Sequence, residues 1–148
     1  MTASSVGKAF FDTNVLLYMH SSADADKQER AWALFQQYND AGRIVLSSQV
    51  VQEFYSAGLR KLALPRERVK QVVTDLLEFP LVLPGPVQIL RAMDLEERYQ
   101  LSFWDALILA AAESGGAEVL FTEDLNDGQQ YGEVLVRNPF GPAVPADL

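Results

Sequence analysis

The stretch Phe10-Phe11-Asp12-Thr13-Asn14-Val15-Leu16 joins an aromatic pair, an acidic turn and a second apolar run. An apolar run that ends at a turn-prone Asp-Thr-Asn predicts a buried strand over Lys8–Phe11. Asp12 would then follow the strand directly. In open α/β sheets, ligands bind outside the carboxyl ends of the strands. The stretch therefore predicts a parallel sheet with a carboxylate at its functional edge.

Short apolar runs and helical patterns alternate along the rest of the chain. We expect about five strands, at 8–11, 44–46, 81–83, 119–121 and 134–136. We expect helices at 25–40, 49–62, 65–78, 86–99 and 103–114, and a helix or a turn at 15–19. This alternation favours an α/β fold, a three-layer α/β/α sandwich around a mostly parallel sheet.

Length and composition fit one domain over residues 1–148. We expect the Pro-rich end, 139–148, to be a loosely held tail. The chain has no cysteine, which excludes disulfides and thiolate metal sites and suits a cytoplasmic protein. The first residues, 1–8, lack an apolar segment behind a basic start, and no apolar run reaches about 20 residues. We therefore expect neither a signal peptide nor a membrane anchor.

The formal net charge of −8 argues against a large phosphate-binding surface. It is compatible with a nucleic-acid enzyme whose acidic residues hold a divalent cation. A modest basic cluster consists of Arg60, Lys61, Arg66, Arg68 and Lys70. This cluster has two interpretations, a solvated helix face or a contact with an RNA backbone.

Four acidic residues are expected to converge at the carboxyl edge of the sheet. Asp12 and Asp124 follow the first and fourth strands, and Glu53 lies early in the helix after the second strand. In a right-handed parallel arrangement these positions share one edge. Asp105 opens the helix that leads into the fourth strand, and a crossover helix begins at that same edge.

Carboxylates gathered at one edge repel one another unless a cation lies between them. Hard oxygen ligands suit Mg²⁺ or Mn²⁺. Two such ions about 4 Å apart can activate a water and stabilise the leaving oxygen of a phosphodiester. The four acids therefore predict metal-dependent chemistry on a phosphodiester.

Each acidic residue also has a purely structural interpretation. Asp12 can form an Asx-turn, and Glu53 can be a surface residue. Asp105 can belong to a capping box that Ser102 opens. Asp124 can belong to a helix start or a loop. The order and placement of all four acids together, rather than any one of them, favour a functional site.

Other enzyme signatures are absent from the sequence. There is no GxGxxG after a strand, no P-loop Gly-Lys-Ser/Thr and no GxSxG. We interpret His20, the single histidine, as a loop or surface residue rather than a ligand. We expect the rings of Trp32 and Trp104 to lie in the core rather than to form platforms for base stacking.

Four stretches carry a resemblance to a known family, namely 11–16 (FDTNVL), 47–54 (SSQVVQEF), 101–108 (LSFWDALI) and 120–125 (LFTEDL). In order and spacing the chain resembles the PIN domain family, and within it the single-domain bacterial ribonucleases that include VapC-type toxins. The resemblance extends from Ala9 to about Phe140. It implies a PIN-like fold.

The resemblance implies a Mg²⁺- or Mn²⁺-dependent endoribonuclease with one or two ions. In such an enzyme a metal-activated water attacks phosphorus and leaves 5′-phosphate and 3′-hydroxyl ends. The family's catalytic and metal-ligating acids match Asp12, Glu53, Asp105 and Asp124.

The resemblance also implies roles for the neighbours of these acids. Asn14 matches the amide that orients the first acid, and Ser102 or Thr122 matches the hydroxyls that support the pocket. Asp124 matches the fourth ligand position of the family. Glu123 and Asp127 are the alternative acids for that position.

Partners follow from the resemblance as well. It implies an RNA substrate, a cognate antitoxin protein if the chain is a toxin, and a homodimer. Two alternatives remain open at the level of the sequence. One is a non-catalytic PIN module that binds protein or RNA. The other is an unrelated α/β phosphohydrolase that uses Asp12 as its nucleophile.

Overall fold

The computed structural model of the chain describes residues 7–141. Residues 1–6, part of the segment in which no signal peptide is expected, and residues 142–148 of the Pro-rich end lie outside this range. The part of the end that is described is held against the fold. The ring of Phe140 meets that of Tyr18 edge-on with centroids 4.9 Å apart, and Arg30 donates a hydrogen bond to the Gly141 carbonyl oxygen (3.1 Å).

Within residues 7–141 the sheet has six strands in the order β3-β2-β1-β4-β6-β5. They are β1 (Lys8–Phe11), β2 (Ile44–Ser47), β3 (Leu81–Val82), β4 (Ala117–Phe121), β5 (Gln130–Tyr131) and β6 (Val134–Arg137). All neighbouring strands are parallel except β5 and β6. The predicted α/β class is therefore confirmed.

The prediction of about five strands omitted β5. This strand has only two residues, Gln130 and Tyr131, and unlike the apolar residues of the equally short β3 they belong to no apolar run in the sequence. It turns back onto β6 through Gly132, whose φ of 59° lies in the left-handed region that glycine adopts without strain.

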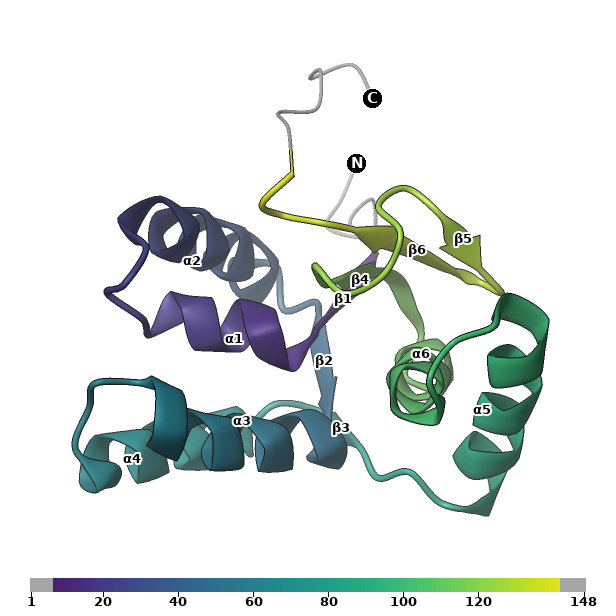
Figure 1. Cartoon of the computed structure of the whole chain (residues 1–148), viewed down its shortest axis with the longest axis horizontal. Helices are drawn as coiled ribbons and strands as arrows, with labels where there is room; N and C mark the ends of the chain where they lie inside the picture. Colours follow the sequence, from purple (N-terminus) through teal and green to yellow (C-terminus); the bar gives the residue numbers. More distant parts are fainter. Residues whose placement is uncertain (1–6, 142–148) are drawn as a thin grey trace.

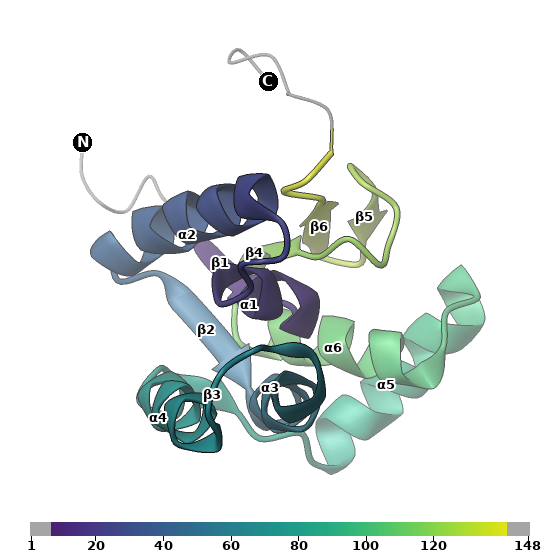
Figure 2. The same ribbon diagram turned by 60° about the vertical axis from the view of Figure 1, so that its left-hand side comes forward.

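Six helices connect the strands in the described part of the chain. They are α1 (Thr13–Met19), α2 (Ala25–Asp40), α3 (Ser48–Lys61), α4 (Arg66–Leu76), α5 (Pro86–Tyr99) and α6 (Phe103–Ser114). Figure 1 shows α1 to α4 on one side of the sheet and α5 and α6 on the other. Right-handed crossovers produce these two layers, because the chain first moves outward from β1 to β3 and then returns to β4. In both views α1 lies between α2 and α3 (Figures 1 and 2).

The core continues from the sheet into α6, where all residues from Ala106 to Ala112 are buried. Trp104 precedes this buried stretch in the first turn and is 63 % exposed. Trp32 is 38 % exposed because Ala31 and Phe35, four residues apart, occupy the buried face of α2. The expectation that both tryptophan rings lie in the core was therefore wrong.

The strand order reverses between the central strands β1 and β4. The chain leaves β1 toward β2, and it leaves β4 toward β6. Phe11 is in register with Phe121, and the Asp12 amide donates to the Phe121 carbonyl oxygen (3.0 Å). The residues that follow the two strands, Asp12 and Thr122, consequently stand side by side. Such a reversal is where open α/β sheets bind their ligands.

A search of the helices within residues 7–141 finds none that is both long and apolar enough to cross a bilayer.

Candidate active site

Asp12 lies at the centre of the edge, 7 % exposed. It caps α1, since its Oδ1 accepts a hydrogen bond from the Thr13 amide (2.7 Å). Its Oδ2 accepts from the Thr122 hydroxyl (2.8 Å). Burial raises the pKa of Asp12 to about 6, the two hydrogen bonds oppose this rise, and the charges of Asp124 and Glu53 add to it.

Thr122 and Asn14 link Asp12 to the next acid, Asp124. The Thr122 hydroxyl is fully buried and accepts from the Asn14 Nδ2 (3.2 Å) and from the Asp124 amide (3.0 Å). The same Asn14 nitrogen donates to the Asp124 Oδ2 (3.0 Å). One amide and one hydroxyl thus hold two carboxylates at the reversal of strand order.

Glu53 approaches the site from α3. Its Oε1 accepts from the Thr13 hydroxyl (2.9 Å), and its Oε2 accepts from the Gln49 Nε2 (3.2 Å). Gln49 also reaches the Trp104 carbonyl oxygen (3.4 Å) and so connects α3 to the first turn of α6. Thr13 and Gln49 were not among the predicted site residues. The signal for Gln49 is its position one turn before Glu53, on the same helix face.

Asp105 stands in the first turn of α6, where its amide donates to the Ser102 hydroxyl (3.1 Å). Ser102 is therefore the N-cap of α6. Burial raises the pKa of Asp105, the hydrogen bond with Ser102 lowers it, and the charges of Asp124 and Glu53 raise it. These charge effects bring Asp105 into the same electrostatic cluster as the other three acids.

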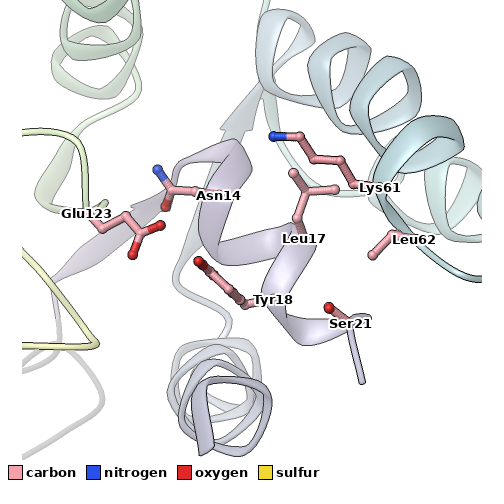
Figure 3. Close-up of a pocket in the computed structure, with 7 residues that line it drawn as sticks. All are labelled: Asn14, Leu17, Tyr18, Ser21, Lys61, Leu62 and Glu123. Carbon is pink, nitrogen blue, oxygen red and sulfur yellow. The ribbon is translucent and has the colours of Figure 1, made fainter. Parts of the chain in front are cut away.

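The two competing acids are engaged elsewhere. Glu123 forms a salt bridge with Lys27 (Nζ–Oε2 3.3 Å). Asp127 accepts a hydrogen bond from the backbone amide of Asn138 (2.9 Å). The side chain of Glu123 faces a small hollow between α1 and the end of α3, which is drawn in Figure 3 and differs from the larger hollow described below. Of the three neighbouring acids, only Asp124 is held by the network around Asp12.

The donor set suits a hard divalent cation in residue type, because it offers four carboxylates and two amides. Two buried amide oxygens, Asn14 Oδ1 and Gln49 Oε1, have no hydrogen-bond partner within residues 7–141. Oxygens of this kind accept from the waters that a hydrated cation carries. Within the same residues, no three His, Cys, Asp or Glu side chains already stand in a metal-holding arrangement. Ionised carboxylates repel one another, and Glu53 would have to turn from its present partners to share a cation.

A hollow of about 390 Å³ opens beside the acids. It is lined by Thr13, Asn14, Leu17, Glu53, Ser56, Ala57, Arg60, Lys61, Glu123 and Asp124. Acidic residues line it near the sheet edge, and two basic residues line it at the last turn of α3. The hollow leaves Glu53 and Asp124 open to solvent.

Several solved structures share the fold of this chain. A chain of a toxin-antitoxin complex from Klebsiella pneumoniae superposes with a TM-score of 0.69 at 21 % identity, covering 90 % of this chain and 98 % of that one. A chain of DNA-bound VapBC from Salmonella typhimurium gives 0.65 at 18 % identity, covering 90 % and 99 %. VapC20 from Mycobacterium tuberculosis, a toxin that cleaves the sarcin-ricin loop, gives 0.62 at 17 % identity, covering 76 % and 87 %. At these identities the likeness concerns the fold.

Sequence comparison extends the likeness beyond the fold. No curated protein sequence gives a significant match to the chain. The sequence profile of the PIN domain, however, matches residues 9–128, which span the elements from β1 through β4 and all four acids. The chain therefore belongs to the PIN domain family.

Proposed function

We propose that this PIN domain is a metal-dependent endoribonuclease that hydrolyses RNA phosphodiester bonds. The observation that carries the proposal is the convergence of four carboxylates where the strand order reverses. Asp12 and Asp124 share the Asn14–Thr122 network, and the charge of Glu53 acts on the pKa of both Asp12 and Asp105. Such an arrangement costs free energy that a bound cation offsets.

The residues that would hold the cation are Asp12, Glu53, Asp105 and Asp124. When bound, Mg²⁺ or Mn²⁺, as one or two ions, lowers the pKa of a water and neutralises charge on the phosphodiester. Cleavage would leave 5′-phosphate and 3′-hydroxyl ends.

The supporting residues act on the acids rather than on RNA. Thr122 donates to Asp12 and fixes the orientation of that carboxylate. Asn14 fixes the orientation of Asp124 through a 3.0 Å hydrogen bond. Ser102 sets the first turn of α6 and with it the position of Asp105. These contacts hold the first-turn and strand-end acids in place before RNA arrives.

The alternative in which Asp12 attacks phosphorus itself is less well supported. A lysine near the phosphate commonly accompanies an aspartate nucleophile, whereas the residues that follow β4 and β6 in this chain are Thr122 and Asn138. Trapping an aspartyl-phosphate on Asp12 would restore that alternative.

We further propose that the chain is the toxin of a toxin-antitoxin pair, acting in the cytoplasm. The solved structures from Klebsiella pneumoniae and Salmonella typhimurium, which share its fold, are toxin-antitoxin assemblies. A short reading frame immediately upstream, whose product binds and inhibits the purified protein, would support this role. A housekeeping role would follow if no neighbouring product bound the protein.

The activity is tested with Asp12→Asn, which keeps the shape of the side chain but removes its charge. With Mn²⁺ present, the parent protein is expected to cleave RNA and the variant to lose about 100-fold or more in rate. Circular dichroism should show that the variant is folded. Undiminished cleavage by the variant would refute the assignment. A parent protein that cuts no RNA over a broad substrate panel would point to the non-catalytic PIN module.

A further inference from the structure

The hollow beside the acids carries two charges of opposite sign to them. Arg60 and Lys61, here called the basic pair, lie in the last turn of α3 and line the same hollow as Glu53 and Asp124. The chain as a whole carries a formal charge of −8. Two neighbouring positive charges beside the acidic centre are therefore unusual for this chain.

Helical spacing explains how the basic pair reaches the hollow. Residues 56 and 57 lie three and four positions after residue 53, and residues 60 and 61 lie three and four positions after residue 57, so all five share one face of α3. At 1.5 Å per residue, Arg60 stands about 10 Å along the helix axis from Glu53. Ser56 and Ala57 lie between them, and their small side chains keep this face open.

The basic side chains extend toward the acids rather than away from them. Side chains on a helix lean toward its N-terminus, which in α3 is the end nearest the sheet edge. Figure 3 shows Lys61 extended in this sense, with its ammonium group on the side of Asn14. The hollow is thus bounded by acids at the sheet edge and by two cations further along α3.

Both members of the basic pair lack an ionic partner among residues 7–141. Other cations of the predicted cluster are engaged on the neighbouring α4. Arg66 donates to the Tyr55 hydroxyl (3.0 Å), and Lys70 pairs with Glu67 (3.7 Å). Arg68, also on α4, has no ionic partner among residues 7–141 either, but of the five basic residues only Arg60 and Lys61 line the hollow.

We propose that the basic pair binds a backbone phosphate of single-stranded RNA adjacent to the scissile one. The inference rests on the proposed ribonuclease function. Arginine offers a planar fork of donors that matches phosphate oxygens, and lysine adds a compact charge. With the scissile phosphate at the acids, a flanking phosphate follows the face of α3 into the hollow. The rest of the acidic surface repels the strand and favours this path.

Binding is tested in the Asp12→Asn background, which holds RNA without cutting it. The probe is a fluorescein-labelled single-stranded RNA of mixed sequence, followed by anisotropy with Mg²⁺ at several salt concentrations. Replacing both Arg60→Gln and Lys61→Gln should weaken binding about 10-fold. The slope of log affinity against log salt should fall by about 0.7 for each phosphate that the protein no longer neutralises.

The matched control carries Arg66→Gln and Lys70→Gln, which remove the same charge from α4. Its affinity and salt slope should equal those of the Asp12→Asn parent. Equal effects of the two double variants would overturn the inference, since they would show a non-specific charge effect. The inference would also fail if the parent bound no RNA or if removal of the basic pair left the affinity unchanged.

Kinetics in the otherwise unchanged protein separate binding from a structural role. Loss of the basic pair should raise KM for RNA and leave kcat within about two-fold of the parent. A fall in kcat with KM unchanged would contradict a binding role. Either result leaves the ribonuclease proposal standing, because that proposal fails only if cleavage does not depend on the acids.

Discussion

Thr122 carries no charge, yet its hydroxyl contacts three parts of the acidic centre. It donates to Asp12 and accepts from Asn14 and from the Asp124 amide. Asn14 and Asp12 are 108 and 110 residues away in the sequence, and Asp124 is two residues ahead. The parallel register of β1 and β4 brings the distant partners to Thr122. A hydroxyl at this position can orient one carboxylate and one amide at once because it has both a donor and two acceptor sites.

Charge on Asp12 is predicted to destabilise the metal-free fold at neutral pH. Its pKa is about 6 in the folded protein, against 3.8 ordinarily, so the folded state retains its proton where the unfolded state has lost it. Protonation of Asp12 therefore favours the folded state, and this contribution is complete below about pH 4 and is lost as the pH rises through 6. At pH 7.5 the free energy of unfolding is lower by about 3 kcal/mol than it would be with Asp12 uncharged. In EDTA, Asp12→Asn should raise the free energy of unfolding by about 1 to 3 kcal/mol at pH 7.5.

Urea denaturation at two pH values checks this prediction. The gain from Asp12→Asn should shrink to about half at pH 5, where the folded protein already protonates Asp12. Asp127→Asn, at an exposed acid outside the network, serves as the control and should show no such pH dependence. A variant that is less stable than the parent at both pH values would contradict the raised pKa.

At the residue scale, the acids were predictable and their connections were not. Asp12 and Asp124 each follow an apolar strand, and the topology of parallel sheets places such residues at one edge. The contact from Thr13 to Glu53 depends on the angle at which α1 crosses α3. No local pattern specifies that angle. The pairing of Lys27 with Glu123, 96 residues apart, was hidden from the sequence for the same reason.

Among the elements, α6 most clearly combines two roles: its middle packs in the core, and its first turn positions a site residue. Its middle is wholly buried against the sheet and α5, and its first turn carries Asp105 at the edge. Ser102 is the residue at which the helix begins, and its hydroxyl accepts the hydrogen bond of the Asp105 amide, which has no partner within the helix. The capping interpretation and the functional interpretation of this stretch are thus compatible, since the cap sets the position of the acid.

Ser102→Ala is predicted to cost about 1 kcal/mol of stability, because it leaves an amide of the first turn without its partner. Chemical denaturation measures the effect. Ser102→Asn, which keeps an oxygen able to cap the helix, should retain most of the stability and provides the matched control. An unchanged denaturation midpoint for Ser102→Ala would show that the cap contributes nothing.

The helices and long strands were predictable because their apolar periodicity is strong and their ends carry caps. The structure lengthens or shortens them by a few residues and resolves 13–19 as a helix. The short strand β5 and the exposure of Trp104 escaped prediction. The two residues of β5 belong to no apolar run, and the burial of an aromatic residue in a first turn depends on where the sheet ends beneath it.

For the whole molecule, α5 forms an outer surface with several exposed apolar side chains. Figure 1 shows this helix outside α6, away from the sheet. Its exposed apolar residues are Val87, Ile89, Leu90 and Met93. An apolar face of this kind on a globular domain can serve as an interaction surface. A second copy of the chain at α5 would form the homodimer that the family resemblance implies.

Leu90→Glu, at a side chain that is 62 % exposed, should weaken such a dimer by on the order of tenfold or more. Sedimentation velocity over a range of concentrations measures the effect. Leu77→Glu, at an exposed leucine that ends α4, should leave association unchanged. A parent protein that is monomeric at all concentrations, or a dimer insensitive to Leu90→Glu, would exclude α5 as the interface.

The most direct measurement is the binding of Mn²⁺, followed by electron paramagnetic resonance, to the parent and to six single variants. Asp12→Asn, Glu53→Gln, Asp105→Asn and Asp124→Asn are each expected to weaken binding roughly tenfold or more, since each removes a ligand. Glu123→Gln and Asp127→Asn should bind Mn²⁺ like the parent, because those acids are engaged with Lys27 and Asn138. Equal binding by all seven proteins, or no binding by the parent, would contradict a metal centre built from the four acids.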